Sequence, residues 1–290
     1  MALLEAKGLT VTYGGLNAND EIDLECEAGK LVGLIGPNGA GKTTFIDAIT
    51  GFTPITRGFV SFDGVDLAGL RPDARAKLGL VRTFQSLELF EDLTVRDNLL
   101  VAAERPKWYS FLSDIVMPGR GRGAALEQIN VALDAMGLHD LADKHPSDLS
   151  HGQRKLVGVA RALAAKPKLL LLDEPAAGLD TKESQLLGSH LRSFLDLDVS
   201  LFLIDHDMGL VLNVCDYIYV LDFGRVIAHG TPAQVRADPA VIAAYLGESA
   251  GEAQAEAGAA ATRSAEAVKS EAVRSGTARS EAVASEVGNE

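Results

Sequence analysis

The sequence has few cysteines and no long uninterrupted apolar run, and both absences narrow the choice of protein class. Cys26 and Cys215 are the only cysteines, and they form no Cys-x-x-Cys pattern. A disulfide framework or a zinc site is therefore not expected, and a reducing compartment fits the sequence. No segment approaches the roughly 20 consecutive apolar residues that cross a bilayer. Any membrane role is therefore expected to come through a partner protein.

Positive charge is also scarce, because 27 Lys and Arg residues stand against 40 Asp and Glu residues and give a formal net charge of −13. The charges are spread along the chain, whereas nucleic-acid binding takes clustered Lys and Arg, so nucleic acid is not expected as a partner. Solubility is the simpler role of the excess acid. The first residues, MALLEAKGLTVTY, lack a basic segment followed by a long apolar run, so no signal peptide is expected.

The pattern of apolar residues predicts alternating strands and helices. Segments typical of strands lie at 3–12, 31–35, 59–62, 169–172, 201–204 and 217–230, the last as a hairpin that turns at Phe223 and Gly224. Helices are expected from Lys42 to about Gly51 and from His151 to Lys166. Such alternation predicts an α/β fold with a mainly parallel sheet and helices on both faces.

Two regions depart from this alternation. Residues 88–161 form a predicted helical insertion, in which Leu126, Ile129 and Leu133 recur at helical spacing. Residues 248–290 are dominated by Ala, Glu, Ser and Arg and lack a large apolar face, so we expect a disordered or weakly helical tail. A docking role for this tail is the alternative.

The first chemical motif is GPNGAGKT at 36–43, which satisfies the pattern G-x-x-x-x-G-K-[ST] of a phosphate-binding loop. Its glycines let backbone N–H groups turn towards phosphate oxygens, and the N-terminus of the following helix adds positive potential. Lys42 supplies a point charge to the β- and γ-phosphates, and Thr43 offers a hydroxyl to Mg²⁺. The expected nucleotide-binding residues of this segment are Gly36, Pro37, Asn38, Gly39, Ala40, Gly41, Lys42, Thr43 and Thr44.

The second motif is LLLLDEP at 169–175, in which a buried strand delivers Asp173 at its C-terminal end. Ligands bind at that end of the strands in open α/β sheets. Asp173 can hold Mg²⁺ through water, and Glu174 is placed to orient or deprotonate the attacking water. An Asp-Glu pair alone is more often the start of a solvated loop, but the phosphate-binding loop strengthens this interpretation.

The third motif is LSHGQ at 149–153, where Ser150 is a candidate N-cap and Gly152 permits close backbone approach. Alone it indicates only the start of a helix. Together the three motifs resemble those of ABC transporter ATPases, whose signature is LSGGQ. In that family the signature binds the γ-phosphate of ATP held by the opposite subunit, which implies that role for Ser150, Gly152 and Gln153.

The resemblance also implies roles for residues outside these motifs. Gln85 in RTFQ resembles the glutamine that touches Mg²⁺ and water and senses the transmembrane partner, and His206 in LIDHDM resembles the histidine that contacts the γ-phosphate. Asp180 in AAGLD resembles the aspartate at the dimer seam, and Tyr13 resembles the aromatic that stacks on adenine. The implied catalytic residues are Glu174, His206 and Gln85, and the implied Mg²⁺ ligands are Thr43, Gln85 and Asp173.

One branch of the family is especially similar, namely the import ATPases of the branched-chain amino-acid type. The similar segments are TTFIDAITGF, RTFQSLELFEDLTVRDNLLVA, DEPAAGL, LIDHDM and HGTPAQVRADPAVIAAYLG, and the resemblance covers nearly all of residues 1–247. It implies a P-loop NTPase fold with an antiparallel β subdomain and an inserted α-helical subdomain. The expected parts are the nucleotide-binding core at 1–87 and 162–247, the helical subdomain at 88–161 and the tail at 248–290.

The resemblance further implies partners and a place in the cell. Two cassettes would hold two ATP molecules between them, beneath two permease subunits that an extracytoplasmic binding protein supplies. The second cassette is the same chain or a related one. ATP hydrolysis on the cytoplasmic face of the membrane would drive uptake. Amino acids are the most frequent cargo of that branch, while urea, amides and other small solutes stay open.

Two local features, and the function itself, admit more than one interpretation. His151 stands where the family usually has Gly, and either it is a tolerated larger residue or it tunes the phosphate contact with pH. The aromatic segment at 104–123 contacts a permease or lipid headgroups, or completes the helical core. Rival functions are an ABC ATPase acting on ribosomes or DNA, a clamp that binds ATP without hydrolysis, and an exporter of lipid-like cargo. The acidic charge and the intact motifs argue against the first two.

Overall fold

A computed structural model describes residues 2–83, 89–104 and 120–245, and side chains in the last range from 123 onward. The chain divides into a unit of residues 1–242 and a unit of residues 243–290, and every element below belongs to the first. Gln85, the aromatic segment 108–117 and the tail 248–290 lie outside the described residues. What the sequence predicts for them therefore stays a prediction.

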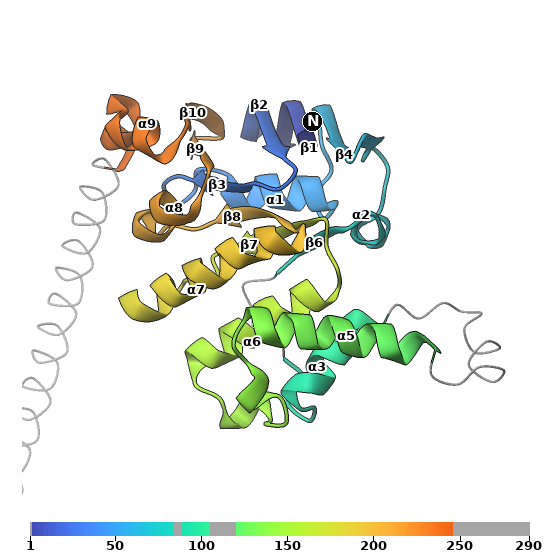
Figure 1. The fold of residues 1–290 in the computed structure, drawn as a ribbon. Helices are drawn as coiled ribbons and strands as arrows, with labels where there is room; N and C mark the ends of the chain where they lie inside the picture. Colours follow the sequence, from blue (N-terminus) through green and yellow to red (C-terminus); the bar gives the residue numbers. More distant parts are fainter. Residues whose placement is uncertain (1, 84–88, 105–119, 246–290) are drawn as a thin grey trace, which may run out of the picture. The chain divides into compact units, whose positions relative to one another are not determined.

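The larger sheet is mainly parallel, as the sequence predicts (Figure 1). Its strand order is β10-β9-β3-β8-β7-β6, and only the β9–β10 hairpin is antiparallel. The strands are β3 (Leu31–Ile35), β6 (Leu80–Arg82), β7 (Leu169–Asp173), β8 (Ser200–Ile204), β9 (Tyr217–Asp222) and β10 (Arg225–Gly230). Every residue of β3, β7 and β8 is buried, because helices or strands cover both faces of the sheet.

The smaller sheet is antiparallel, with the order β2-β1-β4-β5. Its strands are β1 (Ala2–Tyr13), β2 (Leu16–Glu27), β4 (Arg57–Phe62) and β5 (Val65–Asp66). Helix α1 (Lys42–Thr50) lies between the two sheets, and one apolar core joins all three layers (Figure 1). Phe45 on α1 packs against Phe202 on β8, with ring centroids 6.0 Å apart. This packing fixes the helix that follows the phosphate-binding loop.

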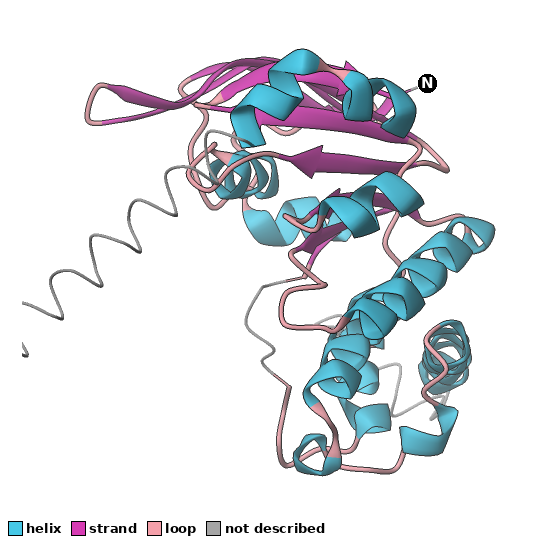
Figure 2. Cartoon of the chain, turned by 90° about the vertical axis from the view of Figure 1, so that its left-hand side faces the viewer, coloured by secondary structure: helices cyan, strands magenta, loops and turns pink. Residues whose placement is uncertain are grey.

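A group of helices lies at the other end of this unit (Figure 2). It consists of α3 (Val95–Ala103), α5 (Arg120–Ala135) and α6 (His151–Ala164), which contact one another. The prediction that α6 reaches Lys166 is wrong by two residues, since the helix ends at Ala164. Lys166 has a φ of 56° and precedes Pro167, which disfavours helical backbone in the residue before it.

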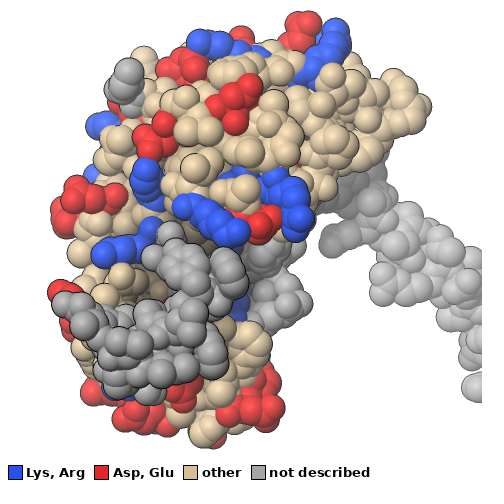
Figure 3. All heavy atoms as spheres, turned by 90° about the vertical axis from the view of Figure 1, so that its right-hand side faces the viewer, with Lys and Arg blue, Asp and Glu red and all other residues tan. Residues whose placement is uncertain are grey.

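Of the other helices, α2 (Pro72–Leu78), α7 (Thr181–Ser193) and α8 (Met208–Val214) connect strands, and α9 (Pro232–Ala237) follows the last strand. Short 3₁₀ turns lie at His139–Leu141, Pro146–Asp148 and Phe194–Leu197. Across the described part of the chain, no helix combines the length and apolar character that a membrane span needs. Both signs of charge are interleaved on the face drawn in Figure 3. On the surface of this unit, Asp73 pairs with both Arg71 and Lys77.

Candidate functional site

The phosphate-binding loop connects β3 to α1, and its glycines are required by close backbone contacts. A Cβ atom on Gly36 would lie 2.0 Å from the carbonyl oxygen of Leu221, and one on Gly41 would lie 2.4 Å from that of Ala18. Gly41 also has a φ of 100° at the N-cap of α1. Side chains at these two positions would push the loop away from β9 and β2. The loop is therefore held against the sheet by backbone packing.

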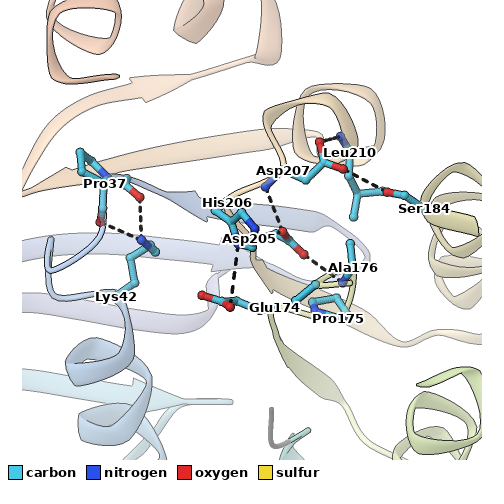
Figure 4. Close-up of polar contacts among 12 residues, drawn as sticks. Pro37, Lys42, Glu174, Pro175, Ala176, Ser184, Asp205, His206, Asp207 and Leu210 are labelled. Atoms are coloured by element: carbon cyan, nitrogen blue, oxygen red, sulfur yellow. Dashed lines mark hydrogen bonds and ion pairs between the residues drawn. The ribbon is translucent and has the colours of Figure 1, made fainter. Parts of the chain in front are cut away.

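Lys42 is the first residue of α1 and is buried. Its Nζ donates hydrogen bonds to the carbonyl oxygens of Gly36, at 2.6 Å, and Pro37, at 2.9 Å (Figure 4). The ammonium group therefore lies inside the curve of the loop. A cation in that place can bind phosphate oxygens that enter the loop.

A cavity of about 400 Å³ opens over this loop. Its lining brings together loop residues, the start of β2, the residue after β7 and the β9–β10 turn: Asn38, Gly39, Ala40, Gly41, Lys42, Thr43, Thr44, Leu16, Asn17, Ala18, Glu174, Phe223 and Gly224. The structure thus places Glu174 on the same cavity as the phosphate-binding residues. Tyr13 pairs across the β1–β2 hairpin with Leu16, and its hydroxyl lies 3.1 Å from Oγ1 of Thr53.

Glu174 follows β7 with strained backbone. Its φ is 48°, and its N–H donates to the carbonyl oxygen of Ile204 at 2.7 Å. One carboxylate oxygen lies 3.8 Å from Nδ1 of His206, which is mostly exposed (Figure 4). Non-glycine residues in this backbone region cost roughly 1–3 kcal/mol and persist where the surrounding structure holds them. The carboxylate and the imidazole therefore form a pair beside the phosphate-binding loop.

Asp173 is buried and forms an ion pair with Arg82, whose Nη2 lies 2.7 Å from Oδ2. The other terminal nitrogen of Arg82 contacts Asp47 on α1. The Asp173 N–H also donates a hydrogen bond of 3.3 Å to Oγ1 of Thr83. The arginine therefore links α1, β6 and β7. No motif in the sequence predicts this role, although Arg82 stands at the start of RTFQ.

Ser150 and Asp180 form a second cluster. Ser150 caps α6 reciprocally with Gln153: Oγ of Ser150 accepts from the Gln153 N–H at 3.2 Å, and Oε1 of Gln153 accepts from the Ser150 N–H at 2.9 Å. Asp180 caps α7, and its own N–H donates to the Glu183 carboxylate. That carboxylate also faces Gly152, where a Cβ atom would lie 2.5 Å from Oε1. Glu183 therefore brings the two capped helix starts together.

The exposed side chain of His151 lies beside Gly178 in this cluster. Of the described residues that line the cavity over the phosphate-binding loop, none comes from this cluster. Within one chain the predicted site residues therefore divide into two groups. One group holds the phosphate-binding loop and Glu174, and the other holds Ser150, Gly152, Gln153 and Asp180.

Comparison with known proteins places the chain in a family. Residues 19–177 match the family model described as ABC transporter, and residues 225–251 match that of the branched-chain amino acid ATP-binding cassette transporter. A high-affinity branched-chain amino acid transport ATP-binding protein of Pseudomonas aeruginosa, BraF, is 40% identical over 85% of this chain and 98% of its own length. LivG of Escherichia coli, which carries the same description, is 39% identical over the same shares.

A more distant relative has a different stated role. The lipopolysaccharide export system ATP-binding protein LptB of Escherichia coli is 35% identical over 86% of this chain and 98% of its own length.

Solved structures agree with this placement. The ADP conformation of MJ1267, an ATP-binding cassette of an ABC transporter, has a TM-score of 0.75 and 31% identity, and the match covers 86% of this chain and all of that one. The dimeric post-hydrolysis state of the cassette MJ0796, bound to ADP and Pi, has a TM-score of 0.65 and 26% identity over 79% and 98%. The chain belongs to the ABC transporter family, as one of its ATP-hydrolysing cassettes.

Proposed function

We propose that the chain is the ATP-hydrolysing subunit of an importer for branched-chain amino acids. The observation that carries this proposal is the match of residues 225–251 to the branched-chain cassette model, which lies outside the general ABC match. The identity to BraF and LivG over almost their whole length points the same way. The nucleotide site does not touch the cargo, so the residues of the site do not distinguish one solute from another.

A second candidate cargo class is lipid, because the relative LptB belongs to a lipopolysaccharide export system. The lower identity of LptB favours the importer. Uptake of radiolabelled leucine, isoleucine and valine in cells with and without the chain tests the choice. Loss of uptake on deletion supports the importer. Unchanged uptake, together with loss of urea or amide uptake or of lipid export, overturns the amino-acid assignment.

Within the cassette, the residues 36–44 would bind the phosphates of ATP and Tyr13 would stack on the adenine. Backbone N–H groups of the loop and the ammonium of Lys42 provide positive potential, and the cavity over the loop has room for the phosphates. The exposed ring of Tyr13, paired with Leu16 at the cavity edge, supports the stacking role.

Thr43, Asp173 and Gln85 would hold Mg²⁺ with the phosphates. Hydroxyl, carboxylate and amide oxygens are ligands that Mg²⁺ accepts, and nucleotide oxygens usually complete its coordination. Asp173 at the end of β7 and Thr43 in the lining of the cavity over the loop provide a carboxylate and a hydroxyl of this kind. When bound, Mg²⁺ would neutralise charge on the transferring phosphate.

Glu174 would orient or deprotonate the water that attacks the γ-phosphate, and His206 would contact that phosphate. Their separation of 3.8 Å supports a shared task beside Lys42. Gln85 would sense the permease and contact Mg²⁺ and water. A carboxylate held by strained backbone at the end of a buried strand is already oriented for that task.

A second cassette would complete each ATP site. The grouping of Ser150, Gly152, Gln153 and Asp180 away from the cavity lining supports this arrangement, because these residues could serve the nucleotide of an opposite chain. The dimeric MJ0796 structure offers a precedent for paired cassettes. Two permeases, an indirect contact with an extracytoplasmic binding protein and a place on the cytoplasmic face of the membrane follow from an importer of this type. We propose that residues 88–161 form the helical subdomain that carries the signature motif.

Substitution of Glu174 by Gln tests the mechanism. We expect the variant to bind ATP, to form a stable dimer in ATP and to lose steady-state hydrolysis. Gel filtration with ATP measures dimer formation, and a phosphate-release assay measures hydrolysis. Glu127→Gln is a matched control, because Glu127 is an exposed residue of α5. Hydrolysis at the parent rate by Glu174→Gln would show that Glu174 is not the base.

A further inference from the structure

Asp205 is a completely buried carboxylate that the proposed mechanism does not use. It follows β8 and precedes His206, whose Nδ1 lies 3.8 Å from Oδ1 of Asp205. Its Oδ2 accepts a hydrogen bond from the N–H of Ala176 at 3.1 Å, and its Oδ1 accepts one from the N–H of Asp207 at 2.9 Å (Figure 4). A buried charge is costly unless it is paired and hydrogen-bonded. The two backbone N–H donors and the imidazole of His206 are therefore the groups that stabilise the Asp205 carboxylate.

Lys155, on the signature helix α6, contacts the same segment as Asp205. Although it is a lysine, it is almost fully buried, and its Nζ donates to the carbonyl oxygen of Pro175 at 3.3 Å and to that of Ala177. Burial lowers the pKa of the Lys155 ammonium, while the charges of Asp205 and Glu174 act in the opposite direction. The geometric link between the two side chains is the segment itself, which Lys155 contacts at Pro175 and Ala177 and Asp205 contacts at Ala176.

The short segment Pro175–Ala177 is thus held from two sides. Lys155 binds its carbonyl groups, and Asp205 binds its central N–H. The segment follows Glu174, whose φ of 48° needs support from its surroundings. We infer that Lys155 and Asp205 are positioning residues that clamp this segment and so fix the direction of the Glu174 carboxylate.

This clamp gives the signature helix a direct connection to the hydrolytic residue of the same chain. Lys155 lies five residues after Ser150, the N-cap of α6. A shift of α6 when Ser150 meets the phosphate of an opposite cassette would therefore move the Lys155 Nζ that binds the carbonyl groups of Pro175 and Ala177. The clamp also joins His206 to the same segment, because Asp205 is its neighbour in the chain. The inference rests on the proposed function, in which Glu174 acts on water.

Asp205→Asn and Lys155→Met test the inference in the full-length chain. An asparagine at 205 offers one acceptor for two N–H groups and removes a negative charge that acts on Lys155, and a methionine at 155 leaves the carbonyls of Pro175 and Ala177 without their donor. We expect kcat for ATP hydrolysis to fall about 10–100-fold in each, since a misplacement of about 1 Å can cost that much. Affinity for a fluorescent ATP analogue should stay within about threefold because the phosphate-binding loop is untouched.

Asp207→Asn is the matched control. Asp207 lies in the same loop and caps α8, where Oδ1 accepts from the N–H of Leu210 and Oδ2 accepts from Ser184, both at 3.1 Å. Its side chain does not hold the Pro175–Ala177 segment. Asparagine caps helices about as well as aspartate, so kcat should stay within about twofold of the parent.

A cycle with Glu174→Gln separates positioning from general damage. If Asp205 acts through Glu174, Asp205→Asn costs little in single-turnover hydrolysis once Glu174 is already Gln. An equal loss in both backgrounds, or a loss in Asp207→Asn as large as in Asp205→Asn, overturns the clamp. If circular dichroism shows that Asp205→Asn does not fold, the same cycle with Lys155→Met tests the clamp by the same criterion. Parent-level hydrolysis by Glu174→Gln would instead overturn the proposed role of Glu174 as the base, on which this inference rests.

Discussion

Replacement of Arg82 by Met should destabilise the fold strongly, because it leaves a buried carboxylate without its cation. The side chains of Arg82 and Asp173 are each only 8% exposed, and their ion pair measures 2.7 Å. Breaking a buried ion pair on one side typically costs about 3–5 kcal/mol in free energy of unfolding. For a unit of this size, that loss corresponds to a fall of roughly 6–20 °C in the unfolding temperature. Asp47 is 30% exposed and can regain water, so its share of the cost is smaller.

Urea unfolding followed by circular dichroism measures the effect, with the midpoints compared at constant m-value. Arg71→Met is the control, because Arg71 is 85% exposed in its pair with Asp73 and should cost within about 0.5 kcal/mol. The double variant Arg82→Met with Asp173→Asn should recover most of the loss, since it removes the uncompensated charge as well. Equal midpoints for the Arg82 and Arg71 variants, or a double variant as unstable as the sum of its parts, would refute this reasoning.

Substitutions at Gly36, Tyr13 and Cys26 test the local packing of the nucleotide site and of the core. Gly36→Ala should abolish binding of a fluorescent ATP analogue, because its Cβ would lie 2.0 Å from the Leu221 carbonyl oxygen; unchanged binding would contradict the packing of the loop. Tyr13→Ala should weaken binding of that analogue by about 1 kcal/mol or roughly fivefold while Tyr13→Phe does not, since stacking needs only the ring; equal losses would assign the effect to the hydroxyl. Burial raises the pKa of the Cys26 thiol from 9.0 to about 12, so the folded state holds a proton that the unfolded state releases, and stability should fall as the pH rises through that range; Cys26→Ser should flatten this slope in thermal unfolding.

Strands β3, β7 and β8 of the larger sheet could be predicted because they are buried on both faces, whereas the three-residue strand β6 is not predicted. Runs such as 31–35 and 169–172 contain only residues that suit a parallel strand between two layers, and the structure buries all of them. Strand β2 is not among the predicted strands, because most of its residues are polar or charged and Glu21 has a φ of 52° within it. The alternation of Ile22, Leu24 and Cys26, all buried, is the signal that could have identified it.

The site shows a similar division. The motif residues that line the cavity over the phosphate-binding loop could be predicted, since a loop of this kind needs particular residues at fixed spacing. Arg82, Lys155 and Asp205 could not, although each lies beside a motif. A charged residue next to a motif is normally solvated. Only the packing of distant strands and helices reveals that all three side chains contact the segment from Asp173 to Ala177.

The segment from Asp173 to Asp180 is contacted by several different elements of this cassette. Its start is held by Arg82 from the strand that leads to Gln85, and its middle by Asp205 and Lys155 from the loop of His206 and the signature helix. Each of those elements meets a different partner in the proposed transporter: the permease, the γ-phosphate or the second cassette. Because Glu174, the proposed base, lies between these attachments on a strained backbone, we expect hydrolysis to depend on all of the partners being in place at once.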